Sequence, residues 1–178
     1  MFLLAQYWRA DRDNKLKARE VLKSAAAHDP LAVYQRLRLG DPVSKEEANN
    51  ALAQIRANAE QGDPIAMFCL AALHDSENGC DTEHDAKTAF EWYSKAAEQG
   101  VSTAQVNLGN MYNRGDDVRQ DAKIAASWFL KAAAQSDPAG QYAMGLLCAA
   151  GSGVPQNGQQ ALQWSVSLVQ LSGCSCCC

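Results

Sequence analysis

The stretch AQVNLGNMYNRGDDVRQDAKIAASWFLKAA, residues 104–133, contains one complete unit of a pattern that recurs along the chain. Its second half carries Trp128, and two further tryptophans stand 36 residues to either side, at Trp92 and Trp164. An alanine lies three residues before each of them, at Ala89, Ala125 and Ala161. An apolar pair lies four and five residues after each, at Ala96/Ala97, Ala132/Ala133 and Leu168/Val169. Spacings of three and four residues mark one face of an α-helix, so the sequence predicts a repeated helix.

A second periodic segment precedes each tryptophan helix. Its apolar positions recur with offsets of 38 and then 36 residues, at Ala66, Leu70 and Leu73, then Ala104, Leu108 and Met111, then Gly140, Met144 and Leu147. The two extra residues of the first copy fall in the loop between its helices, near residues 75–83. Each unit is therefore predicted to be a pair of helices joined by a loop.

Helix-start signals and weaker upstream copies extend the array. Asp-Pro opens three of the first helices, at Asp29-Pro30, Asp63-Pro64 and Asp137-Pro138. Asp is a good N-cap, and Pro suits the first helical turn because its missing N–H has no partner there. Ser102 is expected to cap the remaining first helix. About five helical pairs result, at roughly 1–28, 29–62, 63–100, 101–136 and 137–173.

One pair is too small to bury its own apolar face, so neighbouring pairs must stack into a continuous core. Alanine at fixed positions lets the helix backbones approach closely, and one Trp in each unit is expected to bury a large area against the next pair. We therefore predict a single all-α domain over residues 1–173, an α/α solenoid of helix-turn-helix repeats.

The repeated pattern resembles the Sel-1-like repeat family, which is related to the tetratricopeptide repeats. The unit quoted above carries the family positions Ala104, Leu108, Gly109, Tyr112, Gly115, Val118, Asp121, Ala122, Ala125, Trp128, Ala132 and Ala133. The next unit has Gly151, Gly153 and Val154, with Asn157 at the Asp position. The resemblance covers residues 63–167 and fades upstream, and residues 74–84 replace the usual loop with an acidic insertion.

The resemblance implies a right-handed α/α superhelix and a role as an adaptor in assembly, signalling, secretion or host–microbe contact. The fold itself supplies no chemistry, so function must come from the exposed surface. The expected function is an adaptor or inhibitor that binds a protein partner, with a bacterial immunity or regulatory protein as one form of it. No cofactor is expected.

Charge and hydropathy exclude two classes of partner. The formal charge of −4 disfavours a nucleic-acid binder, which needs a basic face. No run approaches the roughly 20 apolar residues that span a bilayer.

The apolar start, Met1–Trp8, lacks a basic region and a cleavage site, so we interpret it as part of the fold and expect a cytoplasmic protein. A periplasmic or secreted protein whose signal was removed is the alternative.

Four potential zinc ligands, Cys69, His74, Cys80 and His84, fall within sixteen residues. Zinc modules usually present closely spaced Cys pairs, which are missing here, so the preferred interpretation is a packed Cys69 beside a solvated acidic loop. A Cys69–Cys80 disulfide, of the kind that joins the two helices of one repeat in some members of the family that the chain resembles, is another alternative. The acidic loop does not match the EF-hand spacing.

The tail, residues 174–178, holds four of the seven cysteines. Such thiols can bind soft metals, cross-link chains or accept lipid, but Ser175 occupies the position that prenylation of the C-a-a-X type requires. We interpret the tail as disordered. The alternative function is a metal- or redox-responsive protein that uses Cys69, Cys80 and the tail cysteines.

Catalytic motifs are missing from the sequence. The three histidines are scattered, and no nucleophile elbow, phosphate loop or His-Glu-x-x-His motif is present. Gly151-Ser-Gly153 is interpreted as a turn of the repeat rather than a phosphate cradle. The protein is expected not to be an enzyme.

Two surfaces are candidates for partner binding. If the first helix of each pair lines a concave groove, as in tetratricopeptide-type solenoids, one residue of each unit forms a ladder along it: Tyr34, Phe68, Val106 and Tyr142. Asn110 and Asn113 are expected to add polar contacts there, while ordinary packing between helices is the alternative for all six. The last predicted helix offers Val166, Leu168, Val169 and Leu171, which suggests self-association or partner docking at that end.

Overall fold

The computed structural model describes residues 29–38, 43–75, 85–116 and 118–171, of which 37–38 and 165–171 are described by their backbone alone. This part of the chain contains eight helices and no strand. They are α3 (Pro30–Arg38), α4 (Lys45–Glu60), α5 (Pro64–Asp75), α6 (Ala86–Glu98), α7 (Ser102–Arg114), α8 (Ala122–Ala134), α9 (Pro138–Ala150) and α10 (Gly158–Leu171). The predicted all-α solenoid is confirmed.

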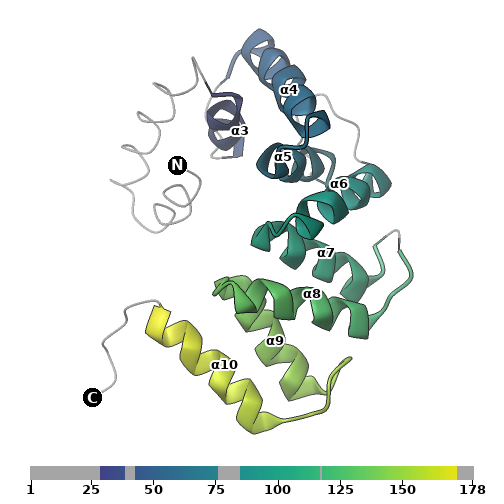
Figure 1. The fold of residues 1–178 in the computed structure, drawn as a ribbon, viewed down its shortest axis with the longest axis vertical. Helices are drawn as coiled ribbons and strands as arrows, with labels where there is room; N and C mark the ends of the chain where they lie inside the picture. The colour runs from purple at the N-terminus through teal and green to yellow at the C-terminus, as the bar shows by residue number, and fades with distance from the viewer. Residues whose placement is uncertain (1–28, 39–42, 76–84, 117, 172–178) are drawn as a thin grey trace.

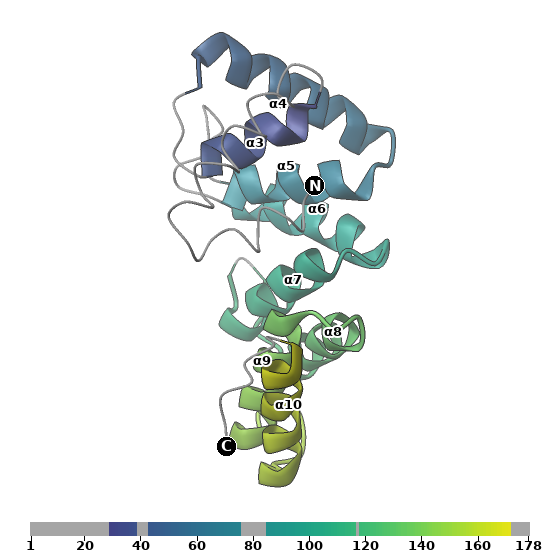
Figure 2. The same cartoon turned by 90° about the vertical axis from the view of Figure 1, so that its left-hand side faces the viewer.

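The helices stack in chain order. Each packs against the next one along the chain, and together they form an arc from α3 at one end to α10 at the other (Figure 1). Figure 2, turned by 90°, shows α4 uppermost and α6 to α10 following in chain order down the long axis. The predicted pair at 1–28 and the tail at 174–178 lie outside the described residues. None of the described helices is long and apolar enough to cross a membrane.

Aspartate caps begin most of these helices. Asp63 Oδ1 accepts from Ile65 N at 2.9 Å, and Asp137 Oδ1 accepts from Ala139 N at 2.9 Å. Asp29 caps α3 in the same way, so all three Asp-Pro starts are confirmed. The second helices begin at Asp85, Asp121 and Asn157, whose side chains accept from backbone N–H groups. The family Asp position is therefore an N-cap.

The prediction for Ser102 was wrong. Val101 occupies the N-cap position of α7 and makes no side-chain cap bond. Ser102 is already helical, so its hydroxyl is free to donate instead to Asp137 Oδ2, at 2.7 Å. Asp137 therefore caps α9 and also ties it to the start of α7.

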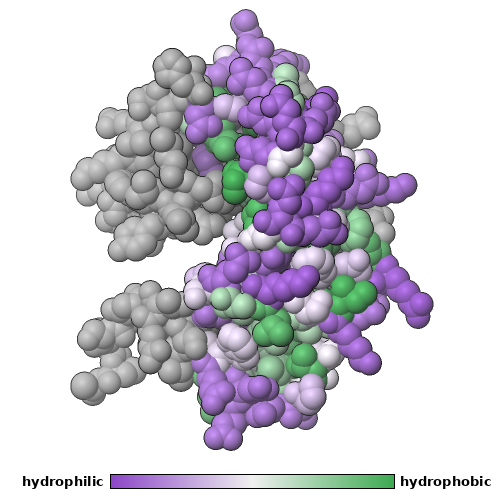
Figure 3. Space-filling model, viewed as in Figure 1, coloured by the Kyte–Doolittle hydropathy of each residue, from purple (hydrophilic) through white to green (hydrophobic). Residues whose placement is uncertain are grey.

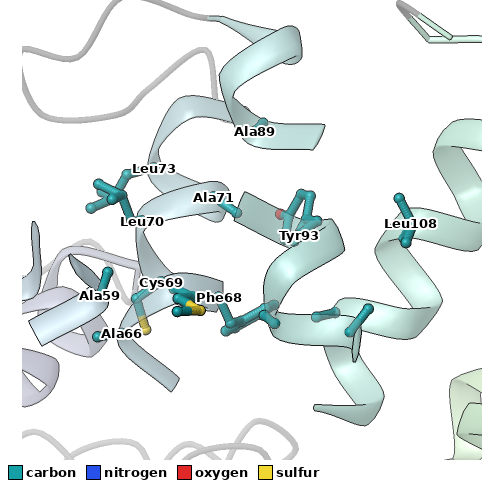
Figure 4. Packing of buried hydrophobic residues seen from close by; sticks show 14 of the residues in the cluster. Ala59, Ala66, Phe68, Cys69, Leu70, Ala71, Leu73, Ala89, Tyr93 and Leu108 are labelled. Atoms are coloured by element: carbon teal, nitrogen blue, oxygen red, sulfur yellow. The ribbon is translucent and has the colours of Figure 1, made fainter. Parts of the chain in front are cut away.

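Alanine and aliphatic residues fill the interior. Ala59, Ala66, Ala71 and Ala89 are fully buried around Leu70, and Figure 4 shows how closely the helices approach there. A second cluster joins Ala125 and Phe129 of α8 to Met144 and Leu147 of α9. Small side chains at fixed positions therefore set the spacing between pairs, as the sequence indicated.

The tryptophans lie less deep than expected. Trp92, Trp128 and Trp164 are half-buried, whereas the residues after the first two, Tyr93 and Phe129, are only 1% and 2% exposed. Lys95 Nζ lies 4.0 Å from the Trp92 ring centroid, and Lys131 Nζ lies 3.7 Å from that of Trp128. Each of these two tryptophans thus keeps one face toward a cation at the surface.

The turn after α9 packs directly against the start of α8. Gly153 has φ +71°, and a Cβ there would lie 2.1 Å from the Ala122 carbonyl oxygen. Only glycine satisfies both the left-handed backbone and this close approach. The interpretation of Gly151-Ser-Gly153 as a turn of the repeat is confirmed.

Candidate partner-binding surface

The N-terminal half of the predicted ladder is buried. Tyr34 is 3% exposed and Phe68 is 5% exposed, so these two side chains do not reach a groove. The Phe68 ring centroid lies 6.0 Å from that of Tyr93, and Figure 4 shows both residues within the core. Helix α5 packs against α3, α4 and α6, and nearly all of its apolar residues are buried.

The C-terminal half of the ladder stays at the surface. On α7, Val106, Asn110 and Asn113 are half-buried. On α9, Tyr142 is 60% exposed. Exposure at the ladder position thus rises along the chain, from a buried Phe68 through a half-buried Val106 to an open Tyr142.

Leu146 belongs to the same surface, although the sequence analysis missed it. It is 53% exposed and lies one helical turn after Tyr142, on the same face of α9. Tyr142 and Leu146 stand 36 residues after Val106 and Asn110, and α7 and α9 are in direct contact. We call this set of surface residues on the two neighbouring helices the α7–α9 strip: Val106, Asn110, Asn113, Tyr142 and Leu146.

A buried amide supports each helix of the strip. In α7, Gln105 is 4% exposed; its Nε2 donates to the Ala97 carbonyl at 3.1 Å, and its Oε1 accepts from Gln135 Nε2 at 2.9 Å. In α9, Gln141 takes the equivalent place and is 6% exposed, but its Oε1 has no hydrogen-bond partner among the described residues. Among the described residues, the buried amide of α9 therefore has an unpaired acceptor, whereas the buried amide of α7 does not.

The strip carries no charged side chain. The nearest ion pair along α7 joins Arg114 to Asp116 at 3.8 Å and is solvent-exposed, so it contributes little. On the face shown in Figure 3, hydrophobic patches lie over the region of α8 and α9, while hydrophilic residues dominate over α4 to α6. An aromatic ring, a leucine and two amides suit binding of a peptide or protein edge.

Of the candidate metal and redox residues, only Cys69 and His74 lie in the described part of the chain. Cys69 is fully buried in α5, consistent with its interpretation as a packed core residue. His74 lies half-buried near the end of the same helix, and Cys80 and His84 lie outside the described residues. Within those residues no group of three or more His, Cys, Asp or Glu could hold a metal ion.

Comparison with known families identifies the repeats. The family model of the Sel1 repeat matches residues 64–101, 102–137 and 138–165, which is more than half of the chain. The chain belongs to the Sel1 repeat family. Sel1 repeats are a non-enzymatic scaffold, and proteins built from them are in general protein-interaction scaffolds. The first helices of the matched repeats are α5, α7 and α9, two of which carry the strip.

Solved structures of Sel1 repeat proteins have the same architecture. A Sel1 repeat protein from Oxalobacter formigenes matches with a TM-score of 0.64 and 33% identity, over 70% of this chain and 50% of its own. A protective antigen of uropathogenic Escherichia coli, which displays this fold, matches with a TM-score of 0.70 and 30% identity, over 87% of this chain and 33% of its own. The chain thus spans half or less of these two relatives.

The similarity to a third structure supports a shared fold and nothing more. Cysteine-rich protein B of Helicobacter pylori matches with a TM-score of 0.55 and 24% identity, over 74% of this chain and 92% of its own. No curated protein matches the chain in sequence.

Proposed function

We propose that this Sel1 repeat protein is an adaptor or inhibitor that holds a protein partner on the α7–α9 strip. The observation that carries the proposal is the adjacent exposure of Tyr142 and Leu146, at 60% and 53%, on one face of α9. Single exposed apolar residues are ordinary, but an aromatic and a leucine one turn apart form a contiguous apolar surface. The equivalent positions of the preceding repeat hold Val106 and Asn110, which are half-buried.

The chemistry of the strip favours an uncharged or weakly charged segment of the partner. The Tyr142 ring and Leu146 supply apolar anchors, and the amides of Asn110 and Asn113 can pair with the N–H and C=O groups of an extended chain. Because the strip has no formal charge, its contacts should survive moderate salt. A role as an immunity or regulatory protein that neutralises a cognate protein is the narrower form of this proposal.

The test is affinity capture from the native source with three baits. Wild type is compared with the double variant Tyr142→Ser, Leu146→Ser and with the control Leu130→Ser. Leu130 is 49% exposed on α8, so the control removes a similarly exposed apolar side chain elsewhere. Circular dichroism and thermal melting first establish that all three baits are folded.

A partner retained by wild type and by Leu130→Ser, but lost by the double variant, supports the proposal. Loss of affinity by about tenfold or more is expected, since anchors of this kind contribute most of the binding energy in an interface. Equal retention of the partner by all three baits would place the binding surface elsewhere.

A further inference from the structure

The second helices of the three matched repeats begin at equivalent side-chain caps, but the cap of α10 is an amide. Asp85 Oδ1 accepts from the backbone N–H groups two and three residues later, at 3.1 and 3.2 Å, and Asp121 Oδ1 does so at 2.9 and 3.1 Å. Asn157 Oδ1 accepts from Gln159 N and Gln160 N, both at 3.1 Å. Asn157 therefore reproduces the geometry of an aspartate cap without its charge.

Asn157 is followed by a glycine, and this neighbour makes its side-chain amide reactive. In an Asn-Gly pair the backbone nitrogen of the glycine can attack the Asn Cγ and close a succinimide ring, because no side chain on the glycine obstructs the approach. The sequence has one other such pair, Asn78-Gly79, which lies outside the described residues. The start of α10 is therefore the place in the described structure where this chemistry is favoured.

The start of α10 is held only weakly by the rest of the fold. Residues 155–160 are all exposed, and a Cβ built on Gly158 would meet nothing within 4 Å. Gly158 is the first residue of α10, so its N–H has no acceptor within the helix. The ring closes when the chain rotates about the Cα–C bond of Asn157, which opens the two cap bonds. Helix ends fray at low cost in free energy, so the folded protein undergoes this opening.

Asparagines inside the helices lack this freedom. Asn107 and Asn110 lie within α7, where the backbone N–H of each following residue belongs to the helical hydrogen-bond ladder. Attack on either side chain requires the middle of α7 to unfold, which costs more free energy than opening the first turn of a helix. These two asparagines are therefore stable references within the same chain.

We propose that Asn157 is a modification site of this protein, converted through a succinimide with Gly158 into an acidic residue at the start of α10. The Gly158 nitrogen bonds to Asn157 Cγ, and its proton leaves with the side-chain NH2 group as ammonia. Water then opens the ring. Attack of water on the side-chain carbon gives aspartate, whereas attack on the main-chain carbonyl carbon gives isoaspartate, in which the main chain runs through Cβ.

The two products act on α10 in opposite directions. The aspartate product accepts the same two backbone N–H bonds as the caps Asp85 and Asp121, and its carboxylate is favoured at the positive end of the helix. Isoaspartate adds a carbon to the main chain at the cap and moves the carboxylate away from those N–H groups. Residues 138–178 contain no Asp, Glu, Lys, Arg or His, so either product also places the first charge in this part of the chain.

The test follows position 157 by mass spectrometry while the purified, folded chain is incubated with reductant at mildly alkaline pH and body temperature. Chymotrypsin suits the digestion, because no Lys or Arg follows Lys131 whereas Tyr142 and Trp164 flank the site. We expect the mass gain of an amide-to-acid exchange at position 157, partly as isoaspartate. The rate should exceed that at Asn107 and Asn110 by at least about tenfold.

Gly158→Ala is the matched control. The added Cβ meets nothing within 4 Å and the backbone is not left-handed there, so the variant should fold as wild type does. The Ala side chain obstructs the attack and favours the helical start, so conversion should slow by at least about tenfold. No conversion at position 157, a rate no higher than at Asn107 and Asn110, or an equal rate in Gly158→Ala would each overturn the proposal.

Asn157→Asp supplies the aspartate product directly. Its free energy of unfolding, measured in urea, should equal or exceed that of wild type, because the carboxylate keeps both cap bonds and gains the favourable helix-end charge. A clear loss of stability in this variant would contradict the assignment of the aspartate product to the cap. The α7–α9 strip takes no part in this chemistry, so the result is independent of the capture experiment.

Discussion

The α7–α8 pair and the α9–α10 pair share one sequence pattern but differ in how far their side chains are covered. In the first, Phe129 is 2% exposed and Gln105 is hydrogen-bonded at both ends of its amide. In the second, Tyr142 and Leu146 are more than half exposed and the Oε1 of Gln141 has no partner among the described residues. The α7–α8 pair also leaves Leu130 49% exposed, so the two pairs differ at particular positions of their first helices rather than throughout.

The largest expected effect is the difference in unfolding free energy between substitutions at a buried position and at an exposed one. Phe129→Ala should lower the free energy of unfolding by about 3–5 kcal/mol, because it leaves a cavity in a tightly packed place. The ring lies so close to Gly109 that a Cβ added there would be 2.7 Å from it. Leu146→Ala should change the free energy of unfolding by less than about 0.5 kcal/mol. Urea unfolding followed by circular dichroism measures both. A large loss for Leu146→Ala would show that this side chain is packed and would remove it from the strip.

The buried amides provide the next comparison. The third repeat has Met67 at this position, so Met is a natural replacement. Gln105→Met loses one buried and one part-buried hydrogen bond and leaves the Ala97 carbonyl without its side-chain donor, which should cost about 2 kcal/mol. Gln141→Met removes an unpaired acceptor and should cost at least about 1 kcal/mol less than Gln105→Met. The same unfolding experiment measures both, and equal losses would show that Gln141 is as well bonded as Gln105.

The smallest effect concerns Tyr93, whose pKa is strongly shifted. Burial, and secondly the Asp75 carboxylate, raise the pKa of Tyr93 well above the usual range, and its hydroxyl donates to Asp75 Oδ2 at 3.2 Å. The folded state thus holds this proton more tightly than the unfolded chain. The contribution of Tyr93 to the free energy of unfolding is therefore fully present below about pH 10 and decreases as the pH rises further.

Tyr93→Phe should cost about 1 kcal/mol at neutral pH, for the lost hydrogen bond, and should flatten the alkaline decline in stability. Unfolding free energies measured at a series of pH values up to the alkaline range check this. A decline of equal steepness in wild type and variant would mean that another group causes it.

Most of the fold follows from the sequence because it depends on local spacing. The alanines at intervals of three and four residues, and the Asp-Pro helix starts, specify helices and their ends without reference to distant residues. Ser102 was misassigned because a hydroxyl at a helix start serves equally well as a cap or as a donor to another helix. Only the position of Asp137 in space decides between the two.

The burial of individual side chains was harder to predict than the positions of the helices that carry them. Trp92 and Tyr93 follow Ala89 by three and four residues, so both lie toward the buried side, and the neighbouring helix determines that Tyr93 points inward. Phe68 and Tyr142 hold equivalent positions in their repeats, so the sequence repeat alone predicts the same exposure for both. The number of neighbouring helices does not separate them either, since α5 and α9 each pack against three helices.

The central claim, that the α7–α9 strip holds the partner, is tested most directly by site-specific photo-crosslinking in the native source. A photoreactive phenylalanine analogue replaces Tyr142 in one sample and Leu130 in another, two exposed sites on neighbouring helices. We predict a covalent adduct of one defined mass from position 142 and none from position 130. An adduct from position 130 with none from position 142 would contradict the account.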